Sequence, residues 1–361
     1  MSGPPAQPGF VWKEKSMAFA NTALQAMKDR CAYLEANRSK LVIDTDTHLT
    51  DLSSLKGKIK AAYDATPNYY HGRPIGHEEI LREMAMAQVD MALSWQNPAA
   101  TAYSGNPAAD FESLMHANRH IFEVTRNYPN SFIPAGWTDP KALGIENALQ
   151  VVDTCLFEFG FPVIKLNPAQ NAYPITSDEV LAIVERIAGA GAVTAFHYGA
   201  DTQFTPAEGL EKVARQFPQA SFLAAHMGGG GAGYLEAERM YLDTREMGIR
   251  NPNIHFIQSA KRDTHIESDF IVFQQAGKPY CNNISCGSDA PYGRISWNFG
   301  GYRAMFKSLQ DTENHTDPRI RNREVVFEEA DIQGYLGGNF VDLILAAYRR
   351  IFAKFDIAFF P

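Results

Sequence analysis

Short apolar runs alternate with segments whose apolar residues recur at helical spacing along most of the chain. Short runs of this kind are typical of buried strands, and the segments between them are typical of amphipathic helices. A regular alternation of the two predicts βα units and a parallel sheet, and eight runs favour the α/β class and a closed (β/α)8 TIM barrel. The predicted strands are residues 41–46, 89–95, 131–137, 162–167, 193–197, 221–226, 253–258 and 282–287.

The same pattern predicts helices before and between the strands. A helix over residues 16–38 precedes the first strand, and further helices are expected over 78–88, 110–126 and 177–188. The last of these begins with Asp178 and Glu179, acids that suit the positive end of a helix dipole. We therefore divide the chain into an N-terminal extension with one helix, residues 1–40, and a metal-dependent barrel, residues 41–361.

Residues of the types that bind metals recur where the predicted strands end. The first apolar run closes on Asp46 and His48, the fifth on His197 and the sixth on His226, and Asp289 follows the eighth. A single histidine on a strand is more often a hydrogen-bonded core residue than a ligand. Together, however, these residues lie at strand ends that a parallel barrel brings to one mouth. The pattern predicts one metal site.

Composition narrows the classes of partner. The formal net charge is −8 and the basic residues are scattered, so neither nucleic acid nor an anionic membrane is an expected partner. The expected partner is a small-molecule substrate. The four cysteines lack the short paired spacing of a disulfide framework or a zinc knuckle, and no signal peptide or membrane anchor is visible. These features favour a cytoplasmic protein.

Three local sequences, together with the Asp-x-His of the first strand, resemble one family. Residues 160–166 read Gly-Phe-Pro-Val-Ile-Lys-Leu, residues 287–291 read Gly-Ser-Asp-Ala-Pro, and residues 336–340 read Leu-Gly-Gly-Asn-Phe. Over about residues 41–349 the chain resembles the amidohydrolase superfamily, in the amidohydrolase-2 branch that includes aminocarboxymuconate-semialdehyde decarboxylase and related aromatic-acid decarboxylases. This set of motifs is specific for the family and unspecific for the substrate.

The resemblance implies roles for the strand-end residues. It makes His48, His197 and Asp289 metal ligands and places His226 beside the metal, facing the substrate. The usual first-strand motif of the family is His-x-His, whereas this chain has Asp46 at the first position. Either an oxygen ligand replaces a nitrogen or that ligand is lost. Because some decarboxylases of the branch carry an acid there, we expect Asp46 to be a ligand.

Two imidazoles and two carboxylates suit one divalent transition metal, zinc first and manganese or iron almost as well. In a hydrolase, Asp289 would accept a proton from a water activated at the metal, and His226 would stabilise the oxyanion or protonate the leaving group. The leading hypothesis is hydrolysis of a small carboxylated or cyclic ester or amide. The first alternative is non-oxidative decarboxylation of an aromatic or unsaturated carboxylic acid. The second is a catalytically inactive ligand-binding barrel, with Asp46 marking a decayed site.

Substrate-binding candidates lie in loops above the predicted mouth and at the end of the fourth strand. An aromatic or unsaturated carboxylate would suit the aromatic and arginine side chains of these loops, although packing of the loops themselves explains them equally well. The resemblance to the superfamily implies that Lys165 could bridge two metals in a carboxylated form, as in its binuclear members, but a role in binding the substrate or supporting a ligand is the preferred interpretation. The candidates are Tyr70, Arg73, Lys165, Arg294 and Trp297.

Two further features carry weaker predictions. His116 and His120 lie four residues apart on one predicted helical face and would bind a metal only if another ligand joined them. The helix 16–38 and the aromatic tail at Phe352, Phe355, Phe359 and Phe360 would expose apolar surface on a monomer, which favours a homodimer. The alternative is that both pack against their own barrel.

Overall fold

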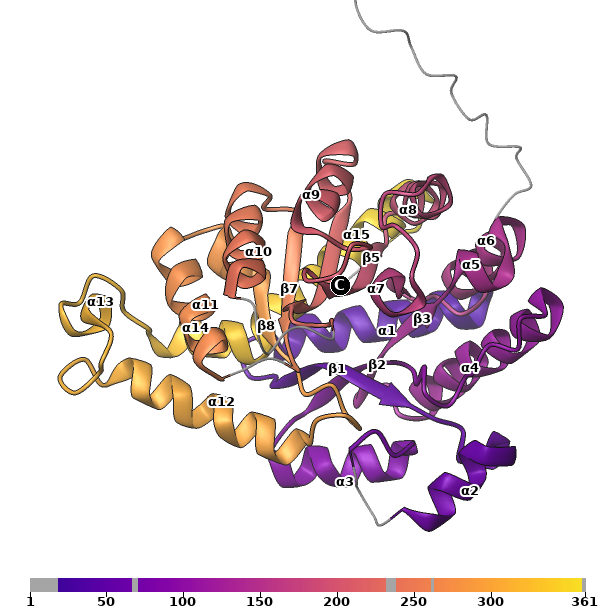
Figure 1. The fold of residues 1–361 in the computed structure, drawn as a ribbon, viewed down its shortest axis with the longest axis horizontal. Helices are drawn as coiled ribbons and strands as arrows, with labels where there is room; N and C mark the ends of the chain where they lie inside the picture. Colours follow the sequence, from indigo (N-terminus) through magenta and orange to yellow (C-terminus); the bar gives the residue numbers. More distant parts are fainter. Residues whose placement is uncertain (1–18, 67–70, 232–237, 261–262, 359–361) are drawn as a thin grey trace, which may run out of the picture.

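The computed structural model describes residues 19–66, 71–231, 238–260 and 263–358. These residues form one parallel eight-stranded sheet in which each strand pairs with the next in sequence (Figure 1). Thr47 bridges to Ala290, so the first strand meets the segment after the last and the barrel nearly closes. The (β/α)8 prediction is confirmed. The strands are β1 Ile43–Leu49, β2 Met91–Gln96, β3 Phe132–Trp137, β4 Val163–Leu166, β5 Val193–Gly199, β6 Ser221–Gly228, β7 Ile254–Gln258 and β8 Ile284–Cys286.

All eight predicted strands are present, but β1 runs farther than its apolar run. Thr47 and His48 still pair with β2, opposite Ser94 and Trp95, although neither side chain is apolar. Backbone pairing continues there because the neighbouring strand supplies the hydrogen-bond partners that buried amide groups require. His48 therefore sits within the strand and not in the loop beyond it.

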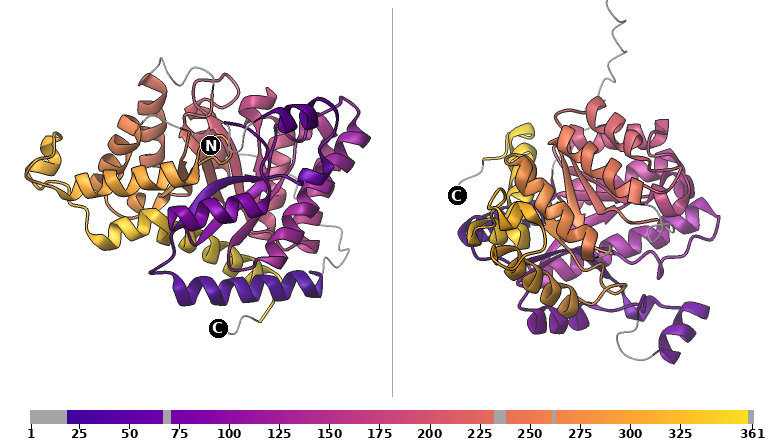
Figure 2. Two further views of the ribbon diagram at one scale, coloured as in Figure 1. Left: turned by 90° about the horizontal axis from the view of Figure 1, so that it is seen from below. Right: turned by 60° about the vertical axis from the view of Figure 1, so that its left-hand side comes forward.

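Helices follow the strands and cover the outside of the barrel (Figures 1 and 2). The predicted helices 78–88, 110–126 and 177–188 correspond to α3, α4 and α8. Ser177 caps α8 by accepting a hydrogen bond from the backbone of Val180. The helical segments are α1 Asn21–Asn37, η1 Leu52–Ser54, α2 Gly57–Ala65, α3 His77–Ala87, α4 Pro107–Asn127, α5 Pro140–Leu143, α6 Ile145–Asp153, η2 Thr154–Glu158, α7 Pro168–Asn171, α8 Asp178–Ala190, α9 Ala207–Gln216, α10 Glu238–Arg250, α11 Asp263–Ala276, η3 Tyr280–Asn283, α12 Ile295–Gln310, α13 Pro318–Arg321, α14 Glu329–Gln333, η4 Gly334–Gly338 and α15 Asn339–Lys354.

Helix α1 packs against α15 at the end of the barrel where the strands begin (Figure 2). Met27 and Leu34 on α1 are fully buried, and the Arg30 Nη1 donates to the hydroxyl of Tyr348 at 3.1 Å. Phe355 lies edge-to-face with Phe19 and Phe157. The apolar side of α1, Phe352 and Phe355 thus pack against the same chain, whereas Phe359 and Phe360 lie outside the described residues. The homodimer stays a prediction.

No helix in the described ranges is both long enough and apolar enough to cross a membrane. All four cysteines, Cys31, Cys155, Cys281 and Cys286, are buried free thiols.

Candidate metal centre

The strand-end residues converge on one buried cluster. Asp46 and His48 lie two residues apart on β1, so their side chains point to the same side of the strand. His197 comes from β5, His226 from β6, and Asp289 from the third position after β8. The sequence prediction that these residues gather at one place is met.

Asp46, His226 and Asp289 form the core of this cluster. Each offers a ligand atom, and these atoms all lie within 4.8 Å of one another. The Nε2 of His48 lies 3.3 Å from Asp289 Oδ1 and 3.8 Å from Asp46 Oδ1, so His48 borders the same centre. The resemblance assigned His226 to the substrate, whereas here it is as close to the carboxylates as a ligand would be.

His197 is engaged at both ring nitrogens. Its Nδ1 lies 3.1 Å from His226 Nε2, and its Nε2 lies 2.7 Å from the carbonyl oxygen of Gly230. Since a carbonyl only accepts, the Nε2 of His197 carries a hydrogen in this arrangement. His197 could bind a metal only after one of these contacts opens, and the same holds for His226, whose nitrogens face Ser259 and His197. Of the two, His226 is the one with a nitrogen within 4.8 Å of both carboxylates. In its present position His197 supports His226.

Ser259, one residue after β7, joins the two sides of the cluster. Its hydroxyl donates to Asp46 Oδ2 at 2.7 Å and lies 2.9 Å from His226 Nδ1. A hydrogen bond of this kind fixes the orientation of both a carboxylate and an imidazole beside a metal. Sequence reasoning missed Ser259, because a lone serine after an apolar run carries no signal of its own.

The Asp44 carboxylate fixes the backbone around two members of the cluster. It accepts hydrogen bonds from the amide of Ser288 at 2.9 Å and from the amide of Asp46 at 3.2 Å, and burial raises its pKa to about 7. Asp289 itself has a φ of +59°, which is a strained value for a residue other than glycine. Strain of this kind persists where surrounding contacts hold it, and it is common at functional sites.

Lys165 lies behind Asp46 and does not line the cavity. Its Nζ is 3.7 Å from Asp46 Oδ1 and 3.5 Å from the centre of the Trp95 ring. Neither Lys165 Nζ nor Asp46 Oδ1 has a hydrogen-bond partner among the described residues. Burial lowers the pKa of Lys165 to about 8, against the opposing charges of Asp46 and Asp289. The lysine therefore offsets charge beneath the carboxylates.

Burial dominates the electrostatics of the remaining groups. It lowers the pKa of both His197 and His226 well below the ordinary value, which favours neutral imidazoles. It raises the pKa of Asp289, and the nearby charge of Asp46 raises it further, while His48 opposes the shift. Neutral imidazoles are the form that binds metals, and a carboxyl group with a raised pKa can carry a proton.

His48 is held for ligation by its other nitrogen. The Nδ1 of His48 lies 2.8 Å from the carbonyl oxygen of Gln96 and donates its hydrogen there, so Nε2 is the nitrogen directed at the two carboxylates. The rings of Trp95 and Tyr292 pack around it at centroid distances of 6.0 and 5.7 Å. The His48 imidazole is therefore surrounded mostly by aromatic side chains.

A cavity of about 560 Å³ opens above the cluster. This volume is in the range of small-molecule sites. Histidines, amides and glycine backbone dominate its wall, and the described part of its lining contains neither arginine nor lysine. The lining residues are His48, His71, Pro98, Gln170, His197, His226, Gly229, Gly230, Gly231, Ala260, Ser288, Asp289, Tyr292, Gly293 and Asn298.

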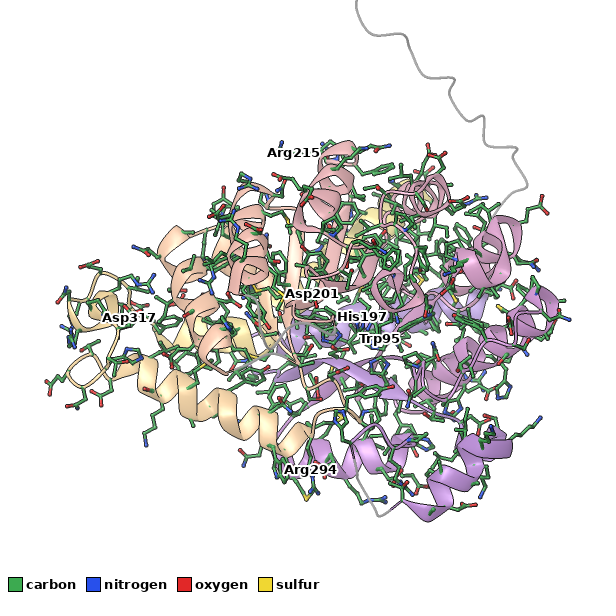
Figure 3. The ribbon with its side chains drawn as sticks, viewed as in Figure 1. Trp95, His197, Asp201, Arg215, Arg294 and Asp317 are labelled. Carbon is green, nitrogen blue, oxygen red and sulfur yellow. The ribbon has the colours of Figure 1, made fainter. Side chains whose placement is uncertain are left out.

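Arg73, Arg294 and Trp297, which were predicted to bind substrate, are not among the residues that line this cavity. Arg294 binds Glu83 through Nε and Nη2, and Figure 3 places it well apart from His197 and Trp95. Arg73 contacts Glu79 at 3.2 Å and stacks on the Tyr63 ring, and the Trp297 side chain is 75% exposed. Tyr70 lies outside the described residues. Gln170 and Asn298 are the amides that line the cavity instead.

The donor set fits a divalent cation. Two buried carboxylates repel each other unless a cation lies between them or one carries a proton. The Oδ1 of Asp46, which accepts no hydrogen bond from any described residue, lies 3.8 Å from the Nε2 of His48, and both atoms face this space. Mixed nitrogen and oxygen ligands suit zinc, manganese or iron. The buried Asp, His and Asp cluster could therefore bind a metal.

A sequence profile of the amidohydrolase family matches residues 43–280, so the chain belongs to that family. No curated protein has significant sequence similarity to the chain. Amidohydrolase-family enzymes are also its structural neighbours, which include decarboxylases, a hydratase and a hydrolase. Metal-dependent catalysis of the amidohydrolase type is accordingly the activity that the family and the site support.

Three solved structures illustrate the fold similarity. A dihydroxybenzoic acid decarboxylase from a Polaromonas species, with bound manganese, is 14% identical with a TM-score of 0.58, covering 84% of this chain and 96% of that one. A 4-oxalomesaconate hydratase from Rhodopseudomonas palustris is 17% identical with a TM-score of 0.54, covering 87% and 97%. A probable 2-pyrone-4,6-dicarboxylic acid hydrolase from Acinetobacter baumannii is 11% identical with a TM-score of 0.54, covering 84% and 98%. At these identities the similarity concerns the fold alone.

Proposed function

We propose that the protein catalyses the non-oxidative decarboxylation of a small aromatic or unsaturated carboxylic acid at one divalent metal. Asp46, His48, His226 and Asp289 would hold the metal, and His197 would position His226. The observation that carries the proposal is the convergence of two buried carboxylates and two imidazoles beneath a single small-molecule cavity. Bound metal would neutralise the carboxylates and bind the carboxylate of the substrate.

The wall of the cavity favours a substrate with one carboxylate. Gln170 and Asn298 offer amides, and His71 an imidazole, to uncharged groups such as ring hydroxyls. A substrate with several carboxylates would be expected to meet arginine or lysine, and the described lining offers neither. The decarboxylase of similar fold is named for dihydroxybenzoic acid, a substrate with one carboxylate and ring hydroxyls.

In the proposed reaction, Asp289 supplies the proton. Asp289 borders both the cluster and the cavity, so in its protonated form it would protonate the carbon that bears the carboxylate. The bond to the carboxyl carbon then breaks, its electron pair returns to the ring or conjugated system, and carbon dioxide leaves. Solvent reprotonates Asp289 through the open cavity. His226, held by Ser259 and His197, keeps its orientation through the cycle.

Hydrolysis of a small carboxylated or cyclic ester or amide is the second candidate. In this reaction the Asp289 carboxylate would accept the proton of an attacking water, and His226 would face the substrate and bind the oxyanion, as the family resemblance implies, instead of binding the metal. The hydrolase among the similar folds supports this alternative. A ligand-binding barrel without catalysis is the third, and it requires that the protein turn over nothing.

The test is a substrate panel. Purified protein loaded separately with Zn²⁺, Mn²⁺ or Fe²⁺ is incubated with hydroxybenzoic acids, unsaturated acids and lactones, and carbon dioxide and acid release are followed. Carbon dioxide without acid release from lactones supports decarboxylation. Acid release from a lactone without carbon dioxide supports hydrolysis instead. The most active metal form identifies the cofactor, which we expect to be zinc or manganese.

The ligand assignment has its own test. His48→Ala and His226→Ala should lose metal during dialysis, whereas His197→Ala should keep it and lose turnover. Metal content per protein, measured after dialysis, separates the three variants. Retention of metal by His226→Ala together with its loss from His197→Ala would restore the assignment that the family resemblance implies.

A further inference from the structure

A second polar cavity lies beside the mouth and shares none of its lining residues. It encloses about 340 Å³ between the ends of β1 and β2, the short helix η1 and the outer helix α4. Its lining includes Thr50, Asp51, Gln96, His116 and His120. None of the roles proposed above uses this cavity.

Four buried polar atoms on the wall of this cavity have no hydrogen-bond partner among the described residues. They are Thr50 Oγ1, Gln96 Oε1, Asn97 Nδ2 and His120 Nε2, and the Thr50, Gln96 and Asn97 side chains are at most 5% exposed. Unpartnered buried polar groups are costly, and native proteins rarely keep several together without an occupant. Three of these four atoms can offer a lone pair, as metal ligands do.

Asp51 supplies the additional ligand that the histidine pair lacked in the sequence. His116 and His120 lie four residues apart on α4 and hence on one face of the helix. The Nε2 of His116 is 2.9 Å from Asp51 Oδ2, a contact across 65 residues of sequence. Two histidines at this spacing with a carboxylate are a zinc-binding arrangement when they share a helical face and an approaching loop.

We propose that His116, His120 and Asp51 form a second divalent transition-metal site. The buried oxygens of Thr50 and Gln96 would accept hydrogen bonds from water that completes the coordination. In the present positions the ligand atoms of the three residues do not all lie within 4.8 Å of one another, so metal binding requires the His120 ring to turn towards Asp51. Burial favours a neutral His120 with a free lone pair.

Such a site would fasten η1 to α4. Asp51 is the N-cap of η1, accepting hydrogen bonds from the amide and hydroxyl of Ser53 at 3.0 and 2.6 Å. The cavity also reaches Gln96, whose carbonyl oxygen orients His48. A metal here would hold the connection after β1 against the barrel beside the first centre.

The test counts Zn²⁺ equivalents in full-length protein stripped by a chelator and titrated calorimetrically. Four proteins are compared: wild type, the double variant His116→Ala/His120→Ala, the mouth variant Asp46→Ala, and Arg119→Gln as an exposed control on α4. We expect two equivalents in wild type and control, and one in each of the other variants. Equal stoichiometry in wild type and the double variant would overturn the second site.

This design separates the second site from the proposed function. If the mouth held no metal but the second site existed, wild type would bind one equivalent and the double variant none. Nitrogen-15 spectra of the histidine rings give an independent readout in unmodified protein. Zn²⁺ should shift the ring signals of both His116 and His120. A shift of His116 alone would indicate adventitious binding to an exposed imidazole and would contradict the proposal.

Discussion

The two ends of the barrel are built differently. At the end where the strands finish, Asp46, His48, His226 and Asp289 lie close together. The Oδ1 of Asp46 and the Nζ of Lys165 there have no hydrogen-bond partner within the described part of the chain. At the end where the strands begin, α1 lays apolar side chains against α15 and the segment before β4. Met27 there packs so closely on Gly160 that a Cβ at residue 160 would lie 2.9 Å from its side chain.

This difference assigns separate roles to the two ends. Burying two carboxylates beside one another lowers the free energy of unfolding, and a bound cation would restore it. The mouth therefore provides the reactive groups at a cost in stability. Packed apolar surface at the opposite end stabilises the fold without touching the site. Substitutions at the mouth should therefore change activity more than stability, and substitutions under α1 should do the reverse.

The largest effect is expected from Asp289→Asn. Removing the group proposed to donate the proton should lower kcat by roughly 10³-fold, the middle of the range for general acid catalysis. The metal-free melting temperature should equal or exceed that of wild type, because a buried carboxylate beside Asp46 is gone. Steady-state kinetics and thermal melts measure both. A strong loss of stability with little loss of kcat would break the comparison.

The reverse behaviour is expected at Leu34 on α1, which is fully buried. Leu34→Ala should lower the free energy of unfolding by about 3 kcal/mol, as for other leucines removed from cores. The kcat of the folded fraction should stay unchanged, because the side chain lies at the far end of the barrel. Urea denaturation and kinetics on the same sample provide the check. A matching fall in kcat would show that the two ends are coupled.

The end where the strands begin also holds a buried histidine. His255, near the start of β7, is buried with its Nε2 2.8 Å from Ser285 Oγ, and burial lowers its pKa to about 3. Unfolded protein therefore binds a proton below about pH 6.5 that folded protein does not bind until near pH 3, so stability falls on acidification across this window.

Between pH 7 and 5 the His255 contribution should be about 2 kcal/mol, from the shift in pKa between folded and unfolded states. His255→Gln should remove that part of the pH dependence, so that the unfolding free energies of variant and wild type converge as the pH falls to 5. Urea denaturation at a series of pH values measures it. Parallel curves for the two proteins would show that His255 has the same pKa in the folded and unfolded states.

The smallest of these effects is expected at Ser259. Ser259→Ala removes the hydroxyl between Asp46 and His226 and should weaken metal affinity about tenfold, as loss of such orienting bonds does at other metal sites. Ser259→Thr keeps a hydroxyl and serves as the matched control. Competition with a chelator gives the affinities. Equal affinity in the alanine variant and wild type would remove Ser259 from the site.

The sequence predicted the barrel well because its strands are buried on both faces and read as apolar runs separated by helical periodicity. It also identified the members of the cluster, since strand ends of a parallel barrel meet at one mouth. It placed the end of β1 too early, because Thr47 and His48 are polar and yet remain paired in the sheet.

Other features lie beyond a reading of the sequence. Arg294 and Trp297 are residue types that often bind substrates. Here Arg294 pairs with Glu83 and the Trp297 side chain is exposed to solvent, and both outcomes depend on how α12 packs against α3. The contact of His116 with Asp51 joins segments far apart in sequence, and no local pattern encodes it. The contact of Ser259 with Asp46 could not be predicted from local sequence either, because only the closure of the barrel brings the two residues together.

Asp46 and Asp289 should bind one cation together with the neighbouring imidazoles. Crystals of metal-loaded protein, measured by anomalous X-ray scattering at the absorption edge of the bound metal, would test it most directly. We expect a peak at bonding distance from both carboxylates and from a nitrogen of His48 or His226. Clear density for the four side chains with no anomalous peak between them would contradict it.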